Sequence, residues 1–234
     1  MDSRSAPDEC AGAARLAGAE HDIANALRRL PQTLFHATLA CNASRIKREG
    51  LTCACTLIKA AERQDTSYQA PLSYRDRTLI LPNGAALRDQ RPMAPELLRR
   101  CLDPTLSVLD WYRLINARVF FWLDAVRLAT YLKASATFDQ VVYTVNTKSL
   151  VQKYANDMEV TPFNVGYAKR RGAPRGLRTF VPLSDWSRSG WAAETAPGRK
   201  TRAASAAAVE LAVRSSIPDF HQHVTAQRLV PAGP

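Results

Sequence analysis

The sequence predicts an α+β fold built on a mostly antiparallel sheet. Short β-branched and aromatic runs recur along the chain, a Pro-Asn-Gly turn at residues 82–84 favours a hairpin, and strands do not alternate regularly with helices. The 234 residues can bury one substantial core, and no internal repeat is visible. We expect one domain over residues 31–234, preceded by an extension over residues 1–30.

The extension differs in composition from the rest of the chain. It is rich in alanine, with Asp8 and Glu9 near its start and Arg28-Arg29 near its end, an order that complements a helix dipole. Apolar residues between Leu16 and Leu30 form a partial stripe at helical spacing. We expect a partly helical extension that packs on the domain.

Local patterns predict the remaining elements. Apolar, β-branched and aromatic runs favour strands, at residues 34–38, 79–81, 85–87, 118–124, 141–145, 179–183 and 208–213. Amphipathic runs favour helices, at residues 44–49, 95–102, 124–133 and 148–154, with a helical turn at 111–116. Gly50 is expected to close the helix over residues 44–49.

Two strands carry polar residues that suggest a site. His36 and Thr38 are two positions apart on the first strand, so their side chains project to one face while Phe35 points the other way. An imidazole and a hydroxyl placed like this could grip a polyol together. Glu210 lies inside the apolar strand over residues 208–213, where an unpaired carboxylate is costly and therefore suggests a function.

The order of these motifs resembles that of ADP-ribosyltransferases, and most closely the DarT-type branch that modifies nucleic acids. The first motif is His36-x-Thr38 with Asn42 and a helix that ends at Gly50, the second is the aromatic strand over residues 118–124, and the third is the Glu210 strand followed by Ile217-Pro218. The Asp89-to-Met93, Trp111-Tyr112 and Val119-to-Trp122 blocks also resemble an uncharacterised bacterial family.

The resemblance implies a split β-sandwich with flanking helices and an enzyme that uses NAD as a substrate, without a metal. The implied NAD-binding residues are His36, Thr38, Asn42, Arg91, Tyr112 and Phe121. The implied catalytic residues are Glu210, facing the positive charge that builds on the ribose, and Arg75 or Arg77, between which the sequence does not choose. In a bacterial setting such an enzyme would be a toxin or phage-defence effector with a neutralising partner protein.

The net charge of +11 favours a nucleic acid as the acceptor. Basic residues crowd a Gly/Pro-rich stretch, and Trp186 and Trp191 are placed to stack on bases, preferably of a single strand. The expected nucleic-acid contacts are Lys169, Arg170, Arg171 and Arg175. A protein acceptor is the nearest competitor.

Several classes of protein are disfavoured. The chain has no Walker A loop, no G-x-G-x-x-G after a strand, no H-E-x-x-H and no G-x-S-x-G. No apolar run approaches the roughly 20 residues of a membrane span, and no signal peptide is visible, so we expect a cytoplasmic protein with no membrane partner. Five cysteines match no standard zinc spacing, and we expect reduced thiols.

Three other activities remain open. An NAD glycohydrolase would cleave the same bond with water as the acceptor. A silent domain could keep the fold and only bind a nucleotide or nucleic acid. RNA 2′-phosphotransfer would use His36 and the arginines, but an acid at position 210 argues against it.

Overall fold

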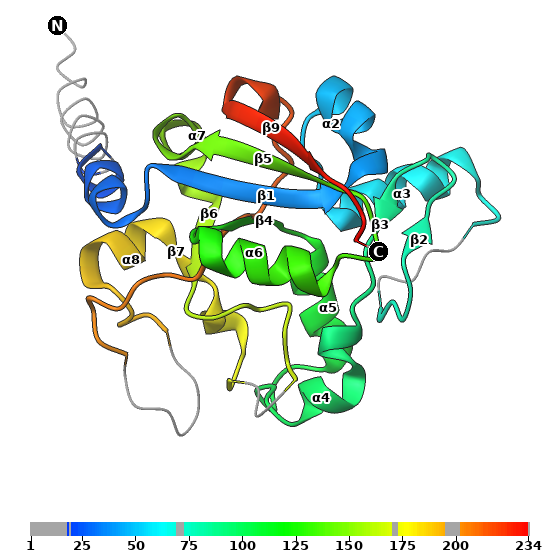
Figure 1. The fold of residues 1–234 in the computed structure, drawn as a ribbon. Coiled ribbons are helices and arrows are strands. Elements are labelled where there is room, and N and C mark those ends of the chain that lie inside the picture. Colours follow the sequence, from blue (N-terminus) through cyan, green and yellow to red (C-terminus); the bar gives the residue numbers. More distant parts are fainter. Residues whose placement is uncertain (1–17, 19, 69–72, 170–172, 195–201, 234) are drawn as a thin grey trace, which may run out of the picture.

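The computed structural model describes residues 18, 20–68, 73–169, 173–194 and 202–233, and it has a mixed α+β architecture, as the sequence predicts. Its centre is a seven-stranded sheet in the order β7-β6-β8-β4-β1-β5-β9, in which every neighbouring pair is antiparallel (Figure 1). The sheet strands are β1 (Thr33–Leu39), β4 (Val119–Trp122), β5 (Gln140–Asn146), β6 (Met158–Thr161), β7 (Val181–Pro182), β8 (Glu210–Val213) and β9 (Val224–Val230). A separate hairpin joins β2 (Leu79–Ile80) to β3 (Ala86–Leu87).

Helices flank the sheet and its lower end in Figure 1. They are α2 (Ala43–Glu49), α3 (Ala54–Gln64), α4 (Pro95–Arg99), α5 (Val108–Asn116), α6 (Ala125–Ala134), α7 (Thr147–Tyr154) and α8 (Leu183–Ser189). A further helix covers residues 20–29 and buries Ala26, and Leu30 just after it is buried in the same core, so the described end of the extension packs on the domain as predicted. None of the described helices is long and apolar enough to cross a membrane.

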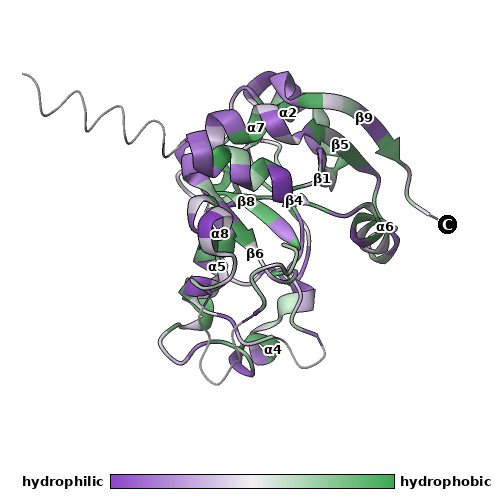
Figure 2. Cartoon of the chain, turned by 90° about the vertical axis from the view of Figure 1, so that its left-hand side faces the viewer, coloured by the Kyte–Doolittle hydropathy of each residue, from purple (hydrophilic) through white to green (hydrophobic). Residues whose placement is uncertain are grey.

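The two faces of the sheet bury different cores. Leu211, Val213 and Phe121 belong to the main core, which the N-terminal helix, α7 and α8 also enter. On the opposite face, α6 packs Leu128 and Leu132 against Val142 of β5. Apolar strand residues therefore lie inside and the polar residues of the helices face outward, as the colouring of Figure 2 shows.

The sheet opens between β1 and β4. The two strands pair at a single position, Phe35 with Trp122, whereas β1 pairs with β5 over all seven of its residues. One step along, the His36 Nδ1 atom bonds the Phe120 carbonyl oxygen at 2.9 Å. The His36 side chain thus binds a carbonyl of β4 that a longer β1–β4 ladder would pair with a backbone amide, and β1 and β4 diverge there.

Two predicted turns are confirmed. Gly84 adopts a φ of 77° in the turn of the β2-β3 hairpin, and Gly50 adopts a φ of 76° where α2 ends. A Cβ atom on Gly50 would lie 2.3 Å from the Ile217 carbonyl oxygen, so this position also requires glycine for space.

The strand expected at residues 179–183 and the exposed tryptophans are two predictions that the fold overturns. Residues 179–183 do not form one strand, because a 3-10 turn over Leu177–Thr179 precedes the two-residue β7 and α8 starts directly after Pro182. Trp186 and Trp191 are not available to bases, because they are 1% and 0% exposed and their rings pack against each other in the main core.

Candidate functional site

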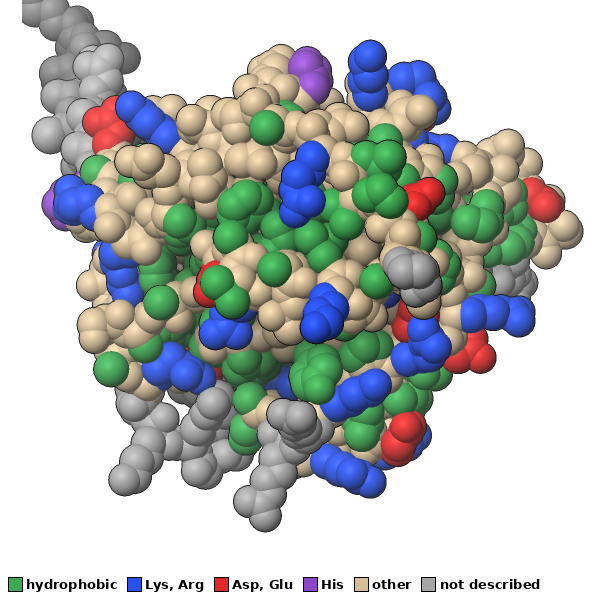
Figure 3. Space-filling model, viewed as in Figure 1, with side chains coloured by type: hydrophobic (Ala, Val, Ile, Leu, Met, Phe, Trp, Pro, Cys, Tyr) green, Lys and Arg blue, Asp and Glu red, His purple; other side chains and the backbone are tan. Residues whose placement is uncertain are grey.

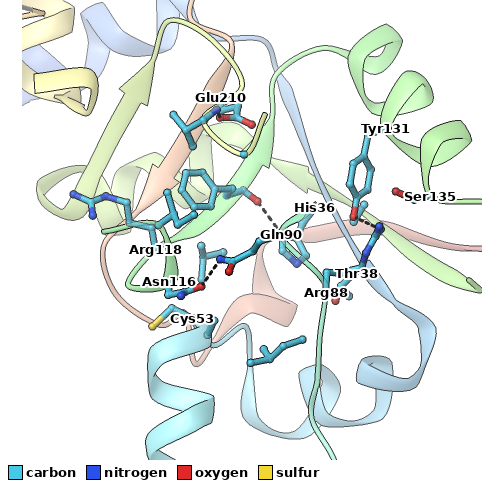
Figure 4. A pocket seen from close by; sticks show the side chains of 18 of the residues that line it. His36, Thr38, Cys53, Arg88, Gln90, Asn116, Arg118, Tyr131, Ser135 and Glu210 are labelled. Atoms are coloured by element: carbon cyan, nitrogen blue, oxygen red, sulfur yellow. Dashed lines mark hydrogen bonds between the residues drawn. The ribbon is translucent and has the colours of Figure 1, made fainter. Parts of the chain in front are cut away.

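A cavity of about 950 Å³ opens where β1 and β4 diverge. Its walls come from β1, β4, β8, α6, the segment over residues 86–93 and a loop over residues 164–169. This volume lies at the upper end of the range for small-molecule sites, about 300–1,000 Å³. Figure 4 shows His36 and Gln90 near its middle, with Glu210 and Arg118 on one side and Arg88 and Tyr131 on the other.

His36 presents a neutral imidazole to the cavity. Its ring lies 5.8 Å from the Phe121 ring and 6.2 Å from the Phe220 ring, and burial lowers its pKa to about 4. In the neutral ring, Nδ1 donates its hydrogen to the Phe120 carbonyl, so Nε2 carries a lone pair. His36 is therefore placed to accept a hydrogen bond from a ligand hydroxyl.

Asn42 positions Thr38 and the hairpin. Its amide nitrogen donates to the Thr38 hydroxyl at 3.0 Å and to the Ala86 carbonyl at 2.9 Å, and its oxygen accepts from the Ala86 amide at 2.8 Å. Both donors of the Asn42 amide are therefore used within the protein. Asn42 lines the cavity, as does Thr38, but its donors serve the fold.

Glu210 brings a buried carboxyl to the cavity wall from the first position of β8. Its Oε2 atom accepts hydrogen bonds from the Val165 amide at 2.9 Å and the Thr161 hydroxyl at 3.3 Å. Among the described residues, none bonds its Oε1 atom. Burial raises the pKa of Glu210 to about 7, against the lowering effect of those two hydrogen bonds and of Arg175 and Arg127.

Arg175 holds the loop that reaches Glu210. Its guanidinium donates to the carbonyls of Val165 and Tyr167 at 3.1 Å each and lies over the rings of Trp111 and Phe163. Arg175 is 1% exposed, so the prediction that it contacts a nucleic acid is wrong. A cation in a Gly/Pro-rich stretch looks exposed in the sequence, but here it is the anchor of a loop.

Arg75 is a buried cation that donates to neutral groups. Its guanidinium donates to the Asn116 side-chain oxygen at 3.2 and 3.1 Å and to the Arg88 carbonyl at 3.1 Å. Gln90 binds the Arg75 backbone and also donates to Asn116. Burial lowers the Arg75 pKa to about 10, which still leaves the group charged at neutral pH.

Basic side chains outnumber acids around the cavity, where Asp89 and Glu210 are the acids among the described lining residues. The cations are Arg45, Arg75, Arg88, Arg91, Arg118, Arg127 and Lys169. Within the described part of the chain, all of them except Arg75 and Lys169 have an acid within 4.0 Å. The site therefore favours a ligand with negative charge.

The structure separates the remaining predicted residues. Arg91 lies exposed on the cavity rim and forms a two-pronged pair with Asp89, and Lys169 is exposed there too. Arg77 is exposed and does not line the cavity, whereas Arg75 does, so of the two arginines only Arg75 lies at the site. Arg170 and Arg171 lie outside the described residues.

The two aromatic predictions fare differently. Tyr112 is 1% exposed, donates to the Met93 carbonyl at 2.6 Å and is not among the lining residues, so its assignment to the ligand site is wrong. Phe121 lines the cavity but is 1% exposed within the main core. Phe120, its neighbour, is half-buried and also lines the cavity.

Sequence reasoning missed several residues of this site. Arg118 lines it and binds Glu159 through both carboxylate oxygens, at 2.6 and 3.2 Å. Arg88 donates to the Tyr131 hydroxyl at 2.9 Å, which ties the hairpin segment to α6. Gln90 lies in the Asp89-to-Met93 block that the sequence analysis singled out, and Asn116 ends the helical turn predicted at residues 111–116. Both amides are buried, which the sequence does not show.

The cysteines form no disulfide among the described residues. Cys53 lines the cavity, and its sulfur lies 3.3 Å from that of Cys55, which is also free. In the described part of the chain, no group of three or more His, Cys, Asp or Glu side chains is arranged to hold a metal ion.

Comparison with known proteins identifies the family of this chain. No curated protein matches the chain. A model described as a family of unknown function matches residues 32–224, which span the strands from β1 to β8 and the cavity residues described above. The chain belongs to this family, DUF7002.

Proposed function

We propose that the protein is a mono-ADP-ribosyltransferase that transfers ADP-ribose from NAD to a nucleic acid. The observation that carries this proposal is the meeting of three groups in one cavity, namely the buried carboxyl of Glu210, the neutral ring of His36 and the buried guanidinium of Arg75. A ligand with ribose hydroxyls, a pyrophosphate and a positively charged leaving group would use all three.

The reaction breaks the bond between the nicotinamide nitrogen and the ribose C1′ atom. The nitrogen takes the bonding electron pair and leaves as neutral nicotinamide, and the acceptor atom forms the new bond to C1′ and loses a proton. Positive charge builds on the ribose during this step, and a carboxylate that faces the charge stabilises it. Glu210 fits this role because Oε2 is fixed by two hydrogen bonds while Oε1 has no bond from the described protein.

The other residues would bind and orient the substrate. His36 would accept a hydrogen bond from a ribose hydroxyl through Nε2, and Thr38 would add a second polar contact. Arg75 would face the pyrophosphate. Phe120 keeps exposed surface in the cavity, whereas Phe121 is enclosed in the core, so we assign the stacking on nicotinamide to Phe120.

The fold supports the same proposal. An antiparallel sheet that opens between β1 and β4, with a cavity at the opening, suits the split β-sandwich that we expect of ADP-ribosyltransferases. The single β1–β4 pair at Phe35 and Trp122 marks where the two halves would part.

Charge supports a nucleic acid as the acceptor. The chain has a net charge of +11, and Lys169 is exposed on the cavity rim. Figure 3 shows Lys and Arg side chains at separate points of one face, among acidic and apolar side chains, which offers contacts to a flexible single strand but no continuous track for a rigid duplex. A bacterial toxin or defence effector of this kind would require a neutralising partner.

The test is transfer of labelled ADP-ribose to separate pools of single-stranded DNA, duplex DNA, RNA and extract protein. We expect label in a single-stranded nucleic-acid pool, abolished by Glu210→Gln and kept by Glu96→Gln, a change at an exposed glutamate of α4. Label found only in the protein pool would show that the acceptor is a protein and not a nucleic acid. Release of nicotinamide without transfer to any pool would identify an NAD glycohydrolase instead.

A further inference from the structure

Arg175 is a fully buried cation that is connected to Glu210 through one residue, although the two side chains do not form an ion pair. Residue Val165 links them, because its carbonyl accepts from the Arg175 Nη1 atom at 3.1 Å and its amide donates to Glu210 Oε2 at 2.9 Å. The Val165 peptide is therefore held from both sides, by Arg175 at its carbonyl and by Glu210 at its amide.

The backbone of Arg175 is itself fixed. Its amide donates to the Cys101 carbonyl at 2.8 Å and its carbonyl accepts from the Asp103 amide at 2.7 Å, which binds the segment to the region after α4. A third side-chain bond runs from Nε to the Ala173 carbonyl at 3.2 Å, so this contact too is with a neutral group. No acid among the described residues forms an ion pair with Arg175.

A buried cation without an ion-pair partner is costly unless an anion lies close enough to interact through the low-dielectric interior. Electrostatic attraction acts on Arg175 from the Cys101 thiol and from Glu210, and Arg127 on α6 is the other cation that acts on the Glu210 carboxyl. Thr161 and Val165 supply the hydrogen bonds on the neighbouring elements.

We infer that Arg175 is a positioning residue for Glu210, which fixes the Val165 loop against Oε2 and supplies the buried positive charge that balances the carboxylate. The inference deepens the proposed function, since it assigns a part in that site to a residue that touches no ligand. Arg175 would hold Oε1 toward the cavity and keep Glu210 able to ionise near neutral pH.

The test reads the ionisation of Glu210 without any substrate. The difference in unfolding free energy between each protein and its Glu210→Gln form, measured by urea denaturation from pH 5 to pH 10, grows above the unfolded-state pKa of Glu210 and levels off at its folded-state pKa. We expect it to level off near pH 7 in the parent chain. In the Arg175→Gln background this levelling pH should rise by about one pH unit, the lower end of the effect of a nearby opposite charge. Arg178→Gln, at an exposed arginine of the same segment, should leave it unchanged.

An equal levelling pH in all three backgrounds would overturn the inference. If Arg175→Gln does not fold, Arg175→Lys serves instead, because it keeps the charge but gives up the fork that holds two carbonyls. Hydrogen exchange at the Val165 amide should then be at least tenfold faster than in the parent, and unchanged protection would contradict the positioning role. A shifted levelling pH without NAD turnover would keep this inference and refute the proposed function.

Discussion

Replacing Glu210 by glutamine should make the protein more stable at alkaline pH and leave its stability unchanged in acid. The new amide side chain has no charge to bury, and its oxygen can still accept from Val165 and Thr161. In the parent chain the buried carboxyl holds its proton more tightly than in the unfolded chain, with a pKa of about 7 in place of the usual 4.5.

The sign of the effect follows from that difference. Below pH 4.5 the carboxyl is protonated in both states, and the folded protein loses no stability. Between pH 4.5 and about 7 the unfolded chain ionises this carboxyl while the folded protein keeps it protonated, so stability falls. Above about pH 7 the carboxyl is ionised in both states, and stability reaches a new plateau. The gap between the two pKa values corresponds to about 3 kcal/mol, at 1.36 kcal/mol for each pKa unit.

Urea denaturation followed by tryptophan fluorescence at pH 5, 7 and 9 measures this effect. The variant should gain about 2.5 kcal/mol over the parent between pH 5 and pH 9, most of it below pH 7. Glu96→Gln provides the control, because its exposed side chain should give the same difference at every pH. A flat difference for Glu210→Gln as well would refute the argument that Glu210 is a buried, costly carboxylate.

Further predictions concern binding, stability and pH. Arg75→Gln should weaken NAD binding at least tenfold by calorimetry while Arg77→Gln leaves it unchanged, and equal losses would remove the distinction between a buried and an exposed arginine. Asn42→Ala should lower the free energy of unfolding by about 2 kcal/mol, since it strips partners from the backbone of Ala86, and a loss below about 0.5 kcal/mol in denaturation would contradict that. The transfer rate of the parent should rise tenfold per pH unit below about 7 and level off above it, because Glu210 acts as the carboxylate; a rate that falls over this range would exclude that role.

Much of the fold follows from local sequence patterns. The His36 strand, the Gly50 helix end, the hairpin at Gly84 and the Glu210 strand are all where the patterns place them, because each depends on alternation or on a residue with a special φ. The sequence analysis did not predict helix α3. This helix buries only Ile58 and Ala61, so its apolar stripe is short.

Two strands gave too little local signal. All of the interior residues of β9 are exposed at the edge of the sheet, so it lacks the apolar alternation that marks a half-buried strand. Strand β6 has only four residues, all of them buried, and one is the glutamate that pairs with Arg118. Tertiary pairing, rather than local preference, determines both.

The site shows the same division between local and tertiary information. His36, Thr38 and Glu210 could be chosen from single strands, because an unusual residue in an apolar strand stands out. Arg75 could not be separated from Arg77, since burial depends on the later segment that contains Gln90. The roles of Arg175 and Tyr112 depend on loops that fold back over α4 and α5, and no local pattern encodes them.

Nicotinamide release from NAD by the purified protein tests the central claim most directly. Chromatography should detect steady release in the presence of single-stranded DNA or RNA, and Glu210→Gln should lower the rate at least about a hundredfold while Glu96→Gln keeps it. No release from the folded parent protein with any acceptor, or equal release by the Glu210→Gln variant, would contradict the claim that this cavity is a transferase site.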